Sequence, residues 1–397
     1  MEQLKRRIGL PLLTAYGVGV MVGAGIYVLI GAVAGAAGVW APVSFLVAGL
    51  IAAPSALSYA ELSTRHPEAA GEAAYIEKGL NSHALAILIG LAIVAVGTSS
   101  AAAVLRGGTG YLIAIVQVDQ NTAIIAIGIT LTLIALIGAL ESLAFAALLT
   151  LVEVIGLALV IYAGFTGPSS ADFTMPPAPE WGGIWIAATL AFFAFIGFED
   201  IVNMAEEVHK PERTLPRAIL WSLAITTGLY ILVSLAAIRI VPIAELAETN
   251  SPLALVWERA TGQSAAFLAM IAVLAALNGV LAQIVMASRV LFGLGKRTPV
   301  LAIFRKTHHR FATPILATVL LGTGTILAAL ALPVAELAEV TTLLLLIIFA
   351  VVNVALIASK RADPTAPFRV HILVPWLGLV TALGALGFAL FGASVSH

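Results

Sequence analysis

The chain has 397 residues, of which 61% are hydrophobic and only 10% charged, and its mean hydropathy is +1.06. A soluble domain carries charge on roughly a quarter of its residues, so this composition excludes a soluble protein and indicates a membrane protein. The net charge of −1 says nothing about a nucleic acid partner, and the absence of cysteine excludes disulfides and thiol chemistry.

Eleven apolar runs follow one another along the chain, each near or above the ~20 residues that an α-helix needs to cross hydrocarbon. They cover residues 10–35, 41–62, 84–117, 121–140, 143–165, 183–205, 216–240, 264–295, 313–332, 337–358 and 372–394. The sequence therefore predicts an all-α polytopic membrane protein, with these runs as helices one to eleven.

Lysine and arginine are distributed unequally between the segments that connect the runs. A cytoplasmic N-terminus places most of them on the inner side: Lys5, Arg6, Arg7, Arg65, Lys78, Lys210, Arg213, Arg217, Lys296, Arg297, Arg305, Lys306, Arg310, Lys360, Arg361 and Arg369. The outer side keeps only Arg239 and Arg259. By the positive-inside rule, we expect a multi-pass protein of the cell membrane with its N-terminus in the cytoplasm and its C-terminus outside.

The first run contains "TAYGVGVMVGAGIYVLIG", which is unusually rich in glycine. A dinucleotide-binding motif does not fit, because that motif needs a preceding strand and a soluble helix. Helix packing would explain the small-xxx-small pairs Gly19–Gly23 and Gly31–Gly35. We favour a third interpretation, a break of the helix near the bilayer midplane at Gly23 and Gly25, because run six is also interrupted, in "AFFAFIGFEDI".

Run one would start inside and run six outside, so two five-helix units that begin there would be inverted repeats. We expect repeats over residues 1–165 and 183–358, followed by an additional eleventh helix over 372–394. Interrupted helices at matching positions of such repeats point to the central binding site of a transporter. At the first break an outer half-helix begins and its amides suit a carboxylate, whereas at the second an outer half-helix ends and its carbonyls suit an ammonium. One cavity with both sites suits an α-amino acid.

Four polar residues within or beside the runs are further candidates. Glu153 in run five is an intramembrane carboxylate, which indicates function by default; we expect it to couple transport to protons, and the alternative is a buried structural carboxyl. Glu199 directly follows the second break, where it would either cap exposed amides or favour a cationic substrate side chain. Asn278 and Thr341 would either reach the substrate side chain or join helices.

Three stretches resemble spans one, six to seven, and eight of the amino acid–polyamine–organocation superfamily, especially bacterial relatives of the cationic amino acid transporters. They are "GVMVGAGIY", "FFAFIGFEDIVNMAEEVHKPERTLPRAI" and "MASRVLFGLGKRTPVLAIF". The resemblance implies the broken-helix transporter fold, with the substrate carboxylate at the backbone of Gly23, Ala24 and Gly25. It implies that the ammonium meets the carbonyls of Met21, Phe193, Ala194 and Ile196.

The chain also departs from the pattern of this superfamily. Ala24 replaces the Ser or Thr that many members carry there, which removes a hydroxyl from the carboxylate site. We also expect eleven spans here, where the superfamily pattern has a twelfth. The resemblance agrees with a coupling role for Glu153, because proton-coupled members can carry a lysine near this point and here an acid takes that place.

We therefore expect a secondary active amino acid transporter that is proton-coupled, works by alternating access and uses no cofactor, metal or covalent chemistry. The alternatives are an amine or polyamine carrier, an amino acid exchanger without proton coupling and, from another class, an ion or water channel, which would need a continuous polar lining. The expected partners are a small-molecule amino acid, protons and the lipid bilayer, with no nucleic acid, and the protein would be a monomer or homodimer. An enzyme is not expected.

Overall fold

The computed structural model describes residues 8–23, 25–67, 71–113, 115–137, 143–169, 178–306 and 313–392. Within these ranges the regular structure is helical, apart from an isolated parallel bridge between Ile8 and Val208. Eight helical stretches of the described chain are long and apolar enough to cross a membrane, and three shorter apolar helices accompany them. The predicted class of an all-α polytopic membrane protein is confirmed.

Each of the predicted apolar runs contains a helix. These are α1 (Leu10–Val22) and α2 (Gly25–Ala37), α3 (Ala41–Arg65), α5 (His83–Ile113), α6 (Gln120–Ile137), α7 (Leu143–Thr166), α8 (Trp181–Phe192), α9 (Pro211–Ile240), α12 (Ala266–Arg297), α13 (Ile315–Ala331), α14 (Val334–Ala362) and α15 (Leu373–Gly392). Helix α9 starts at Pro211, before the predicted residue 216, because a proline in the first turn needs no hydrogen-bond acceptor for its nitrogen.

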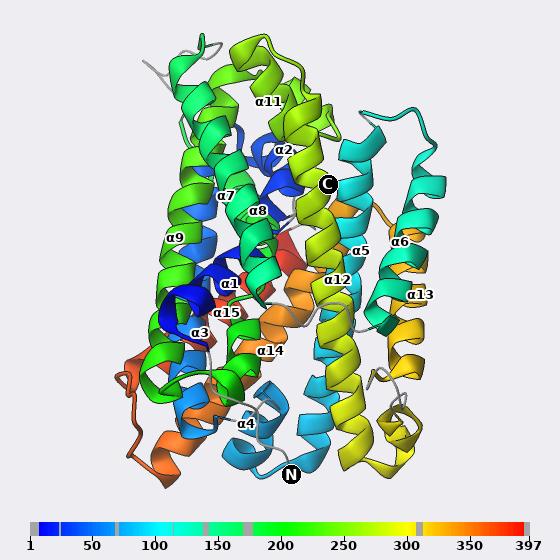
Figure 1. Ribbon diagram of the computed structural model, residues 1–397. Coiled ribbons are helices and arrows are strands. Elements are labelled where there is room, and N and C mark those ends of the chain that lie inside the picture. Colours follow the sequence, from blue (N-terminus) through cyan, green and yellow to red (C-terminus); the bar gives the residue numbers. More distant parts are fainter. Residues whose placement is uncertain are drawn as a thin grey trace.

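Short helices connect or extend these spans. They are α4 (Gly71–Leu80), α10 (Ile243–Glu248), α11 (Pro252–Thr261) and the 3-10 helices η1 (Gly38–Trp40), η2 (Phe193–Phe195), η3 (Glu199–Glu207) and η4 (Pro299–Arg305). Helix α4 and helix α11 lie at opposite ends of the bundle (Figure 1).

The two interrupted helices lie inside the bundle. Helix α1 packs against α7 and α9, α2 packs against α8, and α3 packs against α9. On the other side α5 packs against α12 and α14, with α6 and α13 beside them (Figure 1). Large apolar side chains such as Leu50, Tyr162 and Leu373 are exposed, which is the surface that a lipid environment requires.

A buried group of charges joins α3, α14 and the segment that leads to α15. Glu61 is completely buried and forms ion pairs of 2.7 Å with Arg65 and 2.6 Å with Lys360. The second carboxyl oxygen also accepts a hydrogen bond of 2.8 Å from the Val370 amide. Because a buried charge is tolerated only when it is paired, this cluster fixes the position of three segments at the α4 end of α3.

Candidate functional site

The first predicted break is present between α1 and α2. Helix α1 ends at Val22, and the Gly23 amide makes the last hydrogen bond of its ladder, 2.9 Å to the Gly19 carbonyl. Helix α2 begins at Gly25, whereas Ala24 lies outside the described residues. The first amides of α2 therefore start a new helix, with no partners inside it.

Some glycines of the first run serve helix packing, and others form the break between α1 and α2. A Cβ at Gly19 would collide with the Thr150 side chain on α7, and one at Gly31 would collide with the Leu246 carbonyl. These two glycines allow close packing. A Cβ at Gly23 would meet only backbone atoms of its own helix, so this glycine belongs to the break.

The second break follows α8. After η2 the chain becomes extended at Ile196 and then passes through Gly197 at φ +120°, a conformation that side-chain-bearing residues rarely adopt. The Gly197 amide donates a hydrogen bond of 3.0 Å to Oε2 of Glu199. Glu199 thus satisfies an amide of the segment between η2 and η3, and a role in capping the helix itself stays a prediction.

A tyrosine that the sequence did not single out connects the two breaks. The hydroxyl of Tyr230, on α9, lies 2.6 Å from the carbonyl of Met21 and 2.7 Å from the carbonyl of Ala194. It has one proton to donate to two acceptors, so the carbonyls share a donor and keep acceptor capacity. A tyrosine inside an apolar span needs a partner for its hydroxyl, and this was the available signal in the sequence.

A cavity of about 40 Å³ lies between the two breaks. Its lining consists of Gly19, Val20, Met21, Gly23, Gly25, Ser100, Val104, Phe193, Ile196, Asn278, Gly279, Ala282 and Gln283. Six of the predicted substrate-binding residues are therefore together at one cavity, and Ala194 lies against it through its contact with the Gly25 backbone. Ser100 and Gln283 were not predicted, because a polar residue in a span gives no information on the neighbour it faces.

Glu153 is buried next to this cavity. Its side chain is on α7 and only 1% exposed. Asn278, which lines the cavity from α12, is a polar side chain that faces the carboxyl group, and Tyr27 and Tyr230 also lie near it. Neither carboxyl oxygen makes a hydrogen bond of good geometry among the described residues. Tyr27 donates a hydrogen bond of 2.9 Å to the Glu153 backbone carbonyl. Asn278 thus lies at both the carboxyl group and the cavity.

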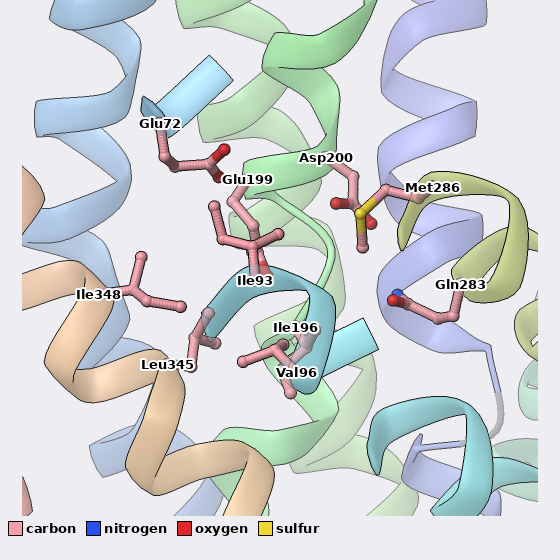
Figure 2. A pocket seen from close by; sticks show the side chains of 10 residues that line it. All are labelled: Glu72, Ile93, Val96, Ile196, Glu199, Asp200, Gln283, Met286, Leu345 and Ile348. Atoms are coloured by element: carbon pink, nitrogen blue, oxygen red, sulfur yellow. The ribbon is translucent and has the colours of Figure 1, made fainter. Parts of the chain in front are cut away.

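Glu199 lines a second, smaller cavity on the α4 side of the first. It lies there with Asp200 and with Glu72 of α4, as Figure 2 shows. The two cavities have Ile196 and Gln283 in common.

Thr341 lines neither of these two cavities. It is fully buried, and its hydroxyl lies 2.6 Å from that of Ser99 and donates a hydrogen bond of 2.7 Å to the Leu337 carbonyl. This is the helix-joining arrangement that the sequence left open. A role for Thr341 in selectivity stays a prediction.

Comparison with known proteins places the chain among permeases. Residues 8–397 match the amino acid permease family. The chain is 29% identical to the branched-chain amino acid permease BcaP of Bacillus subtilis, over 92% of this chain and 83% of the relative. It is 31% identical to the vacuolar cationic amino acid transporter 2 of Arabidopsis thaliana, over 91% of this chain and 61% of that protein. It is also 29% identical to the methylthioribose transporter of Bacillus subtilis, over 96% and 87% of the two chains.

Proposed function

Because the chain belongs to the amino acid permease family, we propose that this transporter moves an α-amino acid by alternating access, driven by protons. The observation that carries the proposal is the cavity of about 40 Å³ that both interrupted helices line, where α2 begins and where the helical segment α8–η2 ends. The two five-helix repeats predicted from the sequence have opposite orientations, and their movement around the cavity would open it to one side of the membrane at a time.

The start of α2 is the proposed carboxylate site. Gly25 lines the cavity, and the first amides of a helix carry a partial positive charge that favours an anion. No arginine, lysine or histidine is among the described residues that line the cavity. The backbone would therefore be the main source of positive potential for the substrate carboxylate.

Carbonyl groups at the second break form the proposed ammonium site. Phe193 and Ile196 line the cavity, and the carbonyls of Met21 and Ala194 share a single hydroxyl proton of Tyr230. Each carbonyl oxygen has two lone pairs, so both can accept a further hydrogen bond from an ammonium. Tyr230 would hold the two acceptors at a fixed separation.

We propose an uncharged substrate side chain. The lining contributed by α5 and α12 consists of Ser100, Val104, Asn278, Gly279, Ala282 and Gln283, all without charge. A charged side chain would lose its hydration here without an ion-pair partner among the described residues that line the cavity. Glu199 stands in the neighbouring cavity, behind Ile196 and Gln283, so a cationic side chain would have to displace this wall.

The size of the cavity supports a closed state of an alternating-access cycle. About 40 Å³ is room for about three water molecules, at roughly 10–15 Å³ for each. An amino acid is larger, so it would enter only after the helices around the cavity move apart. A channel would instead keep a continuous polar pathway.

Counterflow in proteoliposomes tests the proposed function. Unlabelled leucine inside vesicles that contain the protein should accelerate the entry of labelled leucine. Arginine added outside should inhibit this entry less than valine or isoleucine. Blocking either the α-amine or the α-carboxylate should weaken binding about ten- to a hundredfold, because each removes charge-assisted hydrogen bonds worth about 1.5–3 kcal/mol. A decarboxylated amine that binds as well as its parent amino acid would identify an amine carrier instead, and absence of counterflow for every amino acid would contradict the proposal.

Glu153 is the proposed coupling group, and its test is Glu153→Gln. Glutamine resembles a protonated glutamate but cannot release a proton, so exchange of substrate for substrate should survive while accumulation driven by an inward pH gradient is lost. Glu258→Gln, at an exposed position on α11, is the matched control. Gradient-driven accumulation by Glu153→Gln at the level of the control would remove Glu153 from the coupling mechanism.

A further inference from the structure

The second cavity gathers three acidic side chains. Glu72 comes from α4, and Glu199 and Asp200 come from the start of η3, and each is at most 6% exposed. Figure 2 shows the carboxyl group of Glu72 directed toward Glu199, while Asp200 lies on the side of Met286 and Gln283. The cavity measures only about 10 Å³, which is room for about one water molecule.

Among the described residues that line the cavity there is no lysine, arginine or histidine to neutralise the three acids. Helices α5 and α14 contribute Ile93, Val96, Leu345 and Ile348 to the wall. The titratable groups nearby include three tyrosines: Tyr59 of α3 beside Glu72 and Glu199, Tyr75 of α4 against Tyr59, and Tyr16 of α1 beside Asp200. His66 lies against Tyr75, and the exposed Arg289 of α12 lies near Tyr16; neither lines the cavity. Three ionised carboxylates in so dry a site would repel one another strongly.

An unsatisfied acceptor points into the same site. Gln283 is 6% exposed, its amide faces Asp200, and its Oε1 atom has no hydrogen-bond partner among the described residues. Leaving this buried acceptor unsatisfied costs free energy. A ligand that donates a hydrogen bond to Oε1 of Gln283 would therefore be stabilised in this site. Among the described residues no group of three His, Cys, Asp or Glu has the geometry to hold a metal ion.

A proton fits both observations. It needs no volume beyond that of the carboxyl group, it removes a negative charge, and it turns a carboxylate oxygen into the donor that the glutamine oxygen lacks. We propose that Glu72, Glu199 and Asp200 form a proton-binding site, separate from Glu153, whose protonated form holds the α4 side of the substrate cavity closed.

The mechanical consequence follows from where the three acids are attached. Binding of a proton converts a carboxylate to a carboxylic acid, and its release restores the negative charge. Ionisation would then push Glu72, and α4 with it, away from Glu199 and Asp200 on η3. Burial raises the pKa of Glu72 to about 7, so this exchange would fall near neutral pH. The wall formed by Ile196 and Gln283 would lose its support, and water would reach the cavity between the breaks.

The natural absence of cysteine allows a direct test with one introduced thiol. Val96→Cys places the thiol in the wall of the acidic cavity, at a position that is 3% exposed. Its reaction with N-ethylmaleimide is measured on purified full-length protein between about pH 5 and about pH 9, a range that spans the titration of buried carboxyls. Ala362→Cys, exposed at the end of α14, corrects for the ionisation of the thiol itself.

We expect the corrected labelling rate of Val96→Cys to rise at least about tenfold from the acidic to the alkaline end, as the open state gains population. Adding Glu72→Gln, Glu199→Gln and Asp200→Asn should keep labelling slow at every pH, and adding Glu153→Gln should leave the rise intact. A flat profile without these substitutions, or an unchanged rise with all three, overturns the proposal.

A second measurement covers the case in which the triple variant does not fold. Infrared difference spectra of the chain between acidic and alkaline pH should contain the carbonyl stretch of a protonated carboxyl that disappears on alkalinisation, and Glu72→Gln alone should reduce this signal. An unchanged signal in that variant removes Glu72 from the site. The inference rests on the proposed function only in treating the cavity between the breaks as the substrate site that the protonated acids keep closed. Because both measurements use no substrate, their failure is distinguishable from a failure to transport amino acids.

Discussion

The contact between the two breaks makes Gly25→Ala a sensitive test of the site. A Cβ on Gly25 would lie 2.9 Å from Cα and 3.2 Å from Cβ of Ala194. Neither atom is the end of a flexible side chain, so the second break would have to shift as a unit. Forcing one extra carbon into a well-packed core costs typically about 1–3 kcal/mol.

The effect on substrate affinity follows from where the shift occurs. If the strain is relieved by separating the carboxylate site from the ammonium site, the full amount is lost from binding, which corresponds to a roughly 5- to 150-fold weaker affinity. Gly25→Leu should abolish binding, because its side chain would also fill the cavity of about 40 Å³.

The matched control is Gly228→Ala. Gly228 lies within α9, and an added Cβ there would meet nothing within 4 Å, so alanine should be neutral or stabilise the helix by up to roughly 1 kcal/mol. The assay is equilibrium binding of labelled leucine to purified protein, with the thermal midpoint of each variant as a check on folding. Equal affinities for Gly25→Ala, Gly25→Leu and Gly228→Ala would show that the substrate does not bind between these breaks.

Three further predictions concern buried polar groups. Tyr230→Phe should weaken leucine binding by about 1–3 kcal/mol, because two buried carbonyls lose their common donor, whereas the exposed Tyr162→Phe should not; equal binding by both variants would contradict this role. Burial raises the pKa of Glu72 from 4.5 to about 7, so its contribution to stability is present below pH 4.5 and is lost as pH rises through about 7. That loss is about 3 kcal/mol at 1.36 kcal/mol per unit, and Glu72→Gln should flatten the pH dependence of thermal unfolding by this amount. Glu61→Gln should lower the free energy of unfolding by about 3–5 kcal/mol by leaving its two cationic partners unpaired, whereas Glu245→Gln in an exposed ion pair should cost less than about 1 kcal/mol; similar thermal midpoints would refute the distinction.

The helices and the first break could be predicted from the sequence because they depend on local composition. Apolar length fixes where a helix can cross a membrane, and the paired interruptions of runs one and six located a cavity that the structure forms. Gly19 and Gly31 show the limit of this reasoning, since the same small residue permits a close helix contact and cannot be distinguished locally from a residue at a break.

The partners of buried polar groups could not be read from the sequence. Tyr230 is more than 200 positions from Met21, and Glu72 is as distant from Gln283. Their meeting depends on how α4, α9 and α12 pack, which no local pattern encodes. For the same reason the second cavity was missed, although Glu199 had been noticed as a residue at the break.

The isolated bridge at the start of the described chain imposes a constraint on lengths. Ile8 pairs with Val208, and the His209 amide donates a hydrogen bond of 2.9 Å to the Ile8 carbonyl. Helix α1 has 13 residues and η3 has nine, so they rise about 20 Å and about 18 Å. The bridge joins the start of α1 to the residue that follows η3, and Tyr230 joins the end of α1 to Ala194 of η2, five residues before η3. An insertion or deletion in α1, or between Ala194 and Val208, would therefore separate the partners of the bridge or of Tyr230. Changes of length should be tolerated here only when both segments change together.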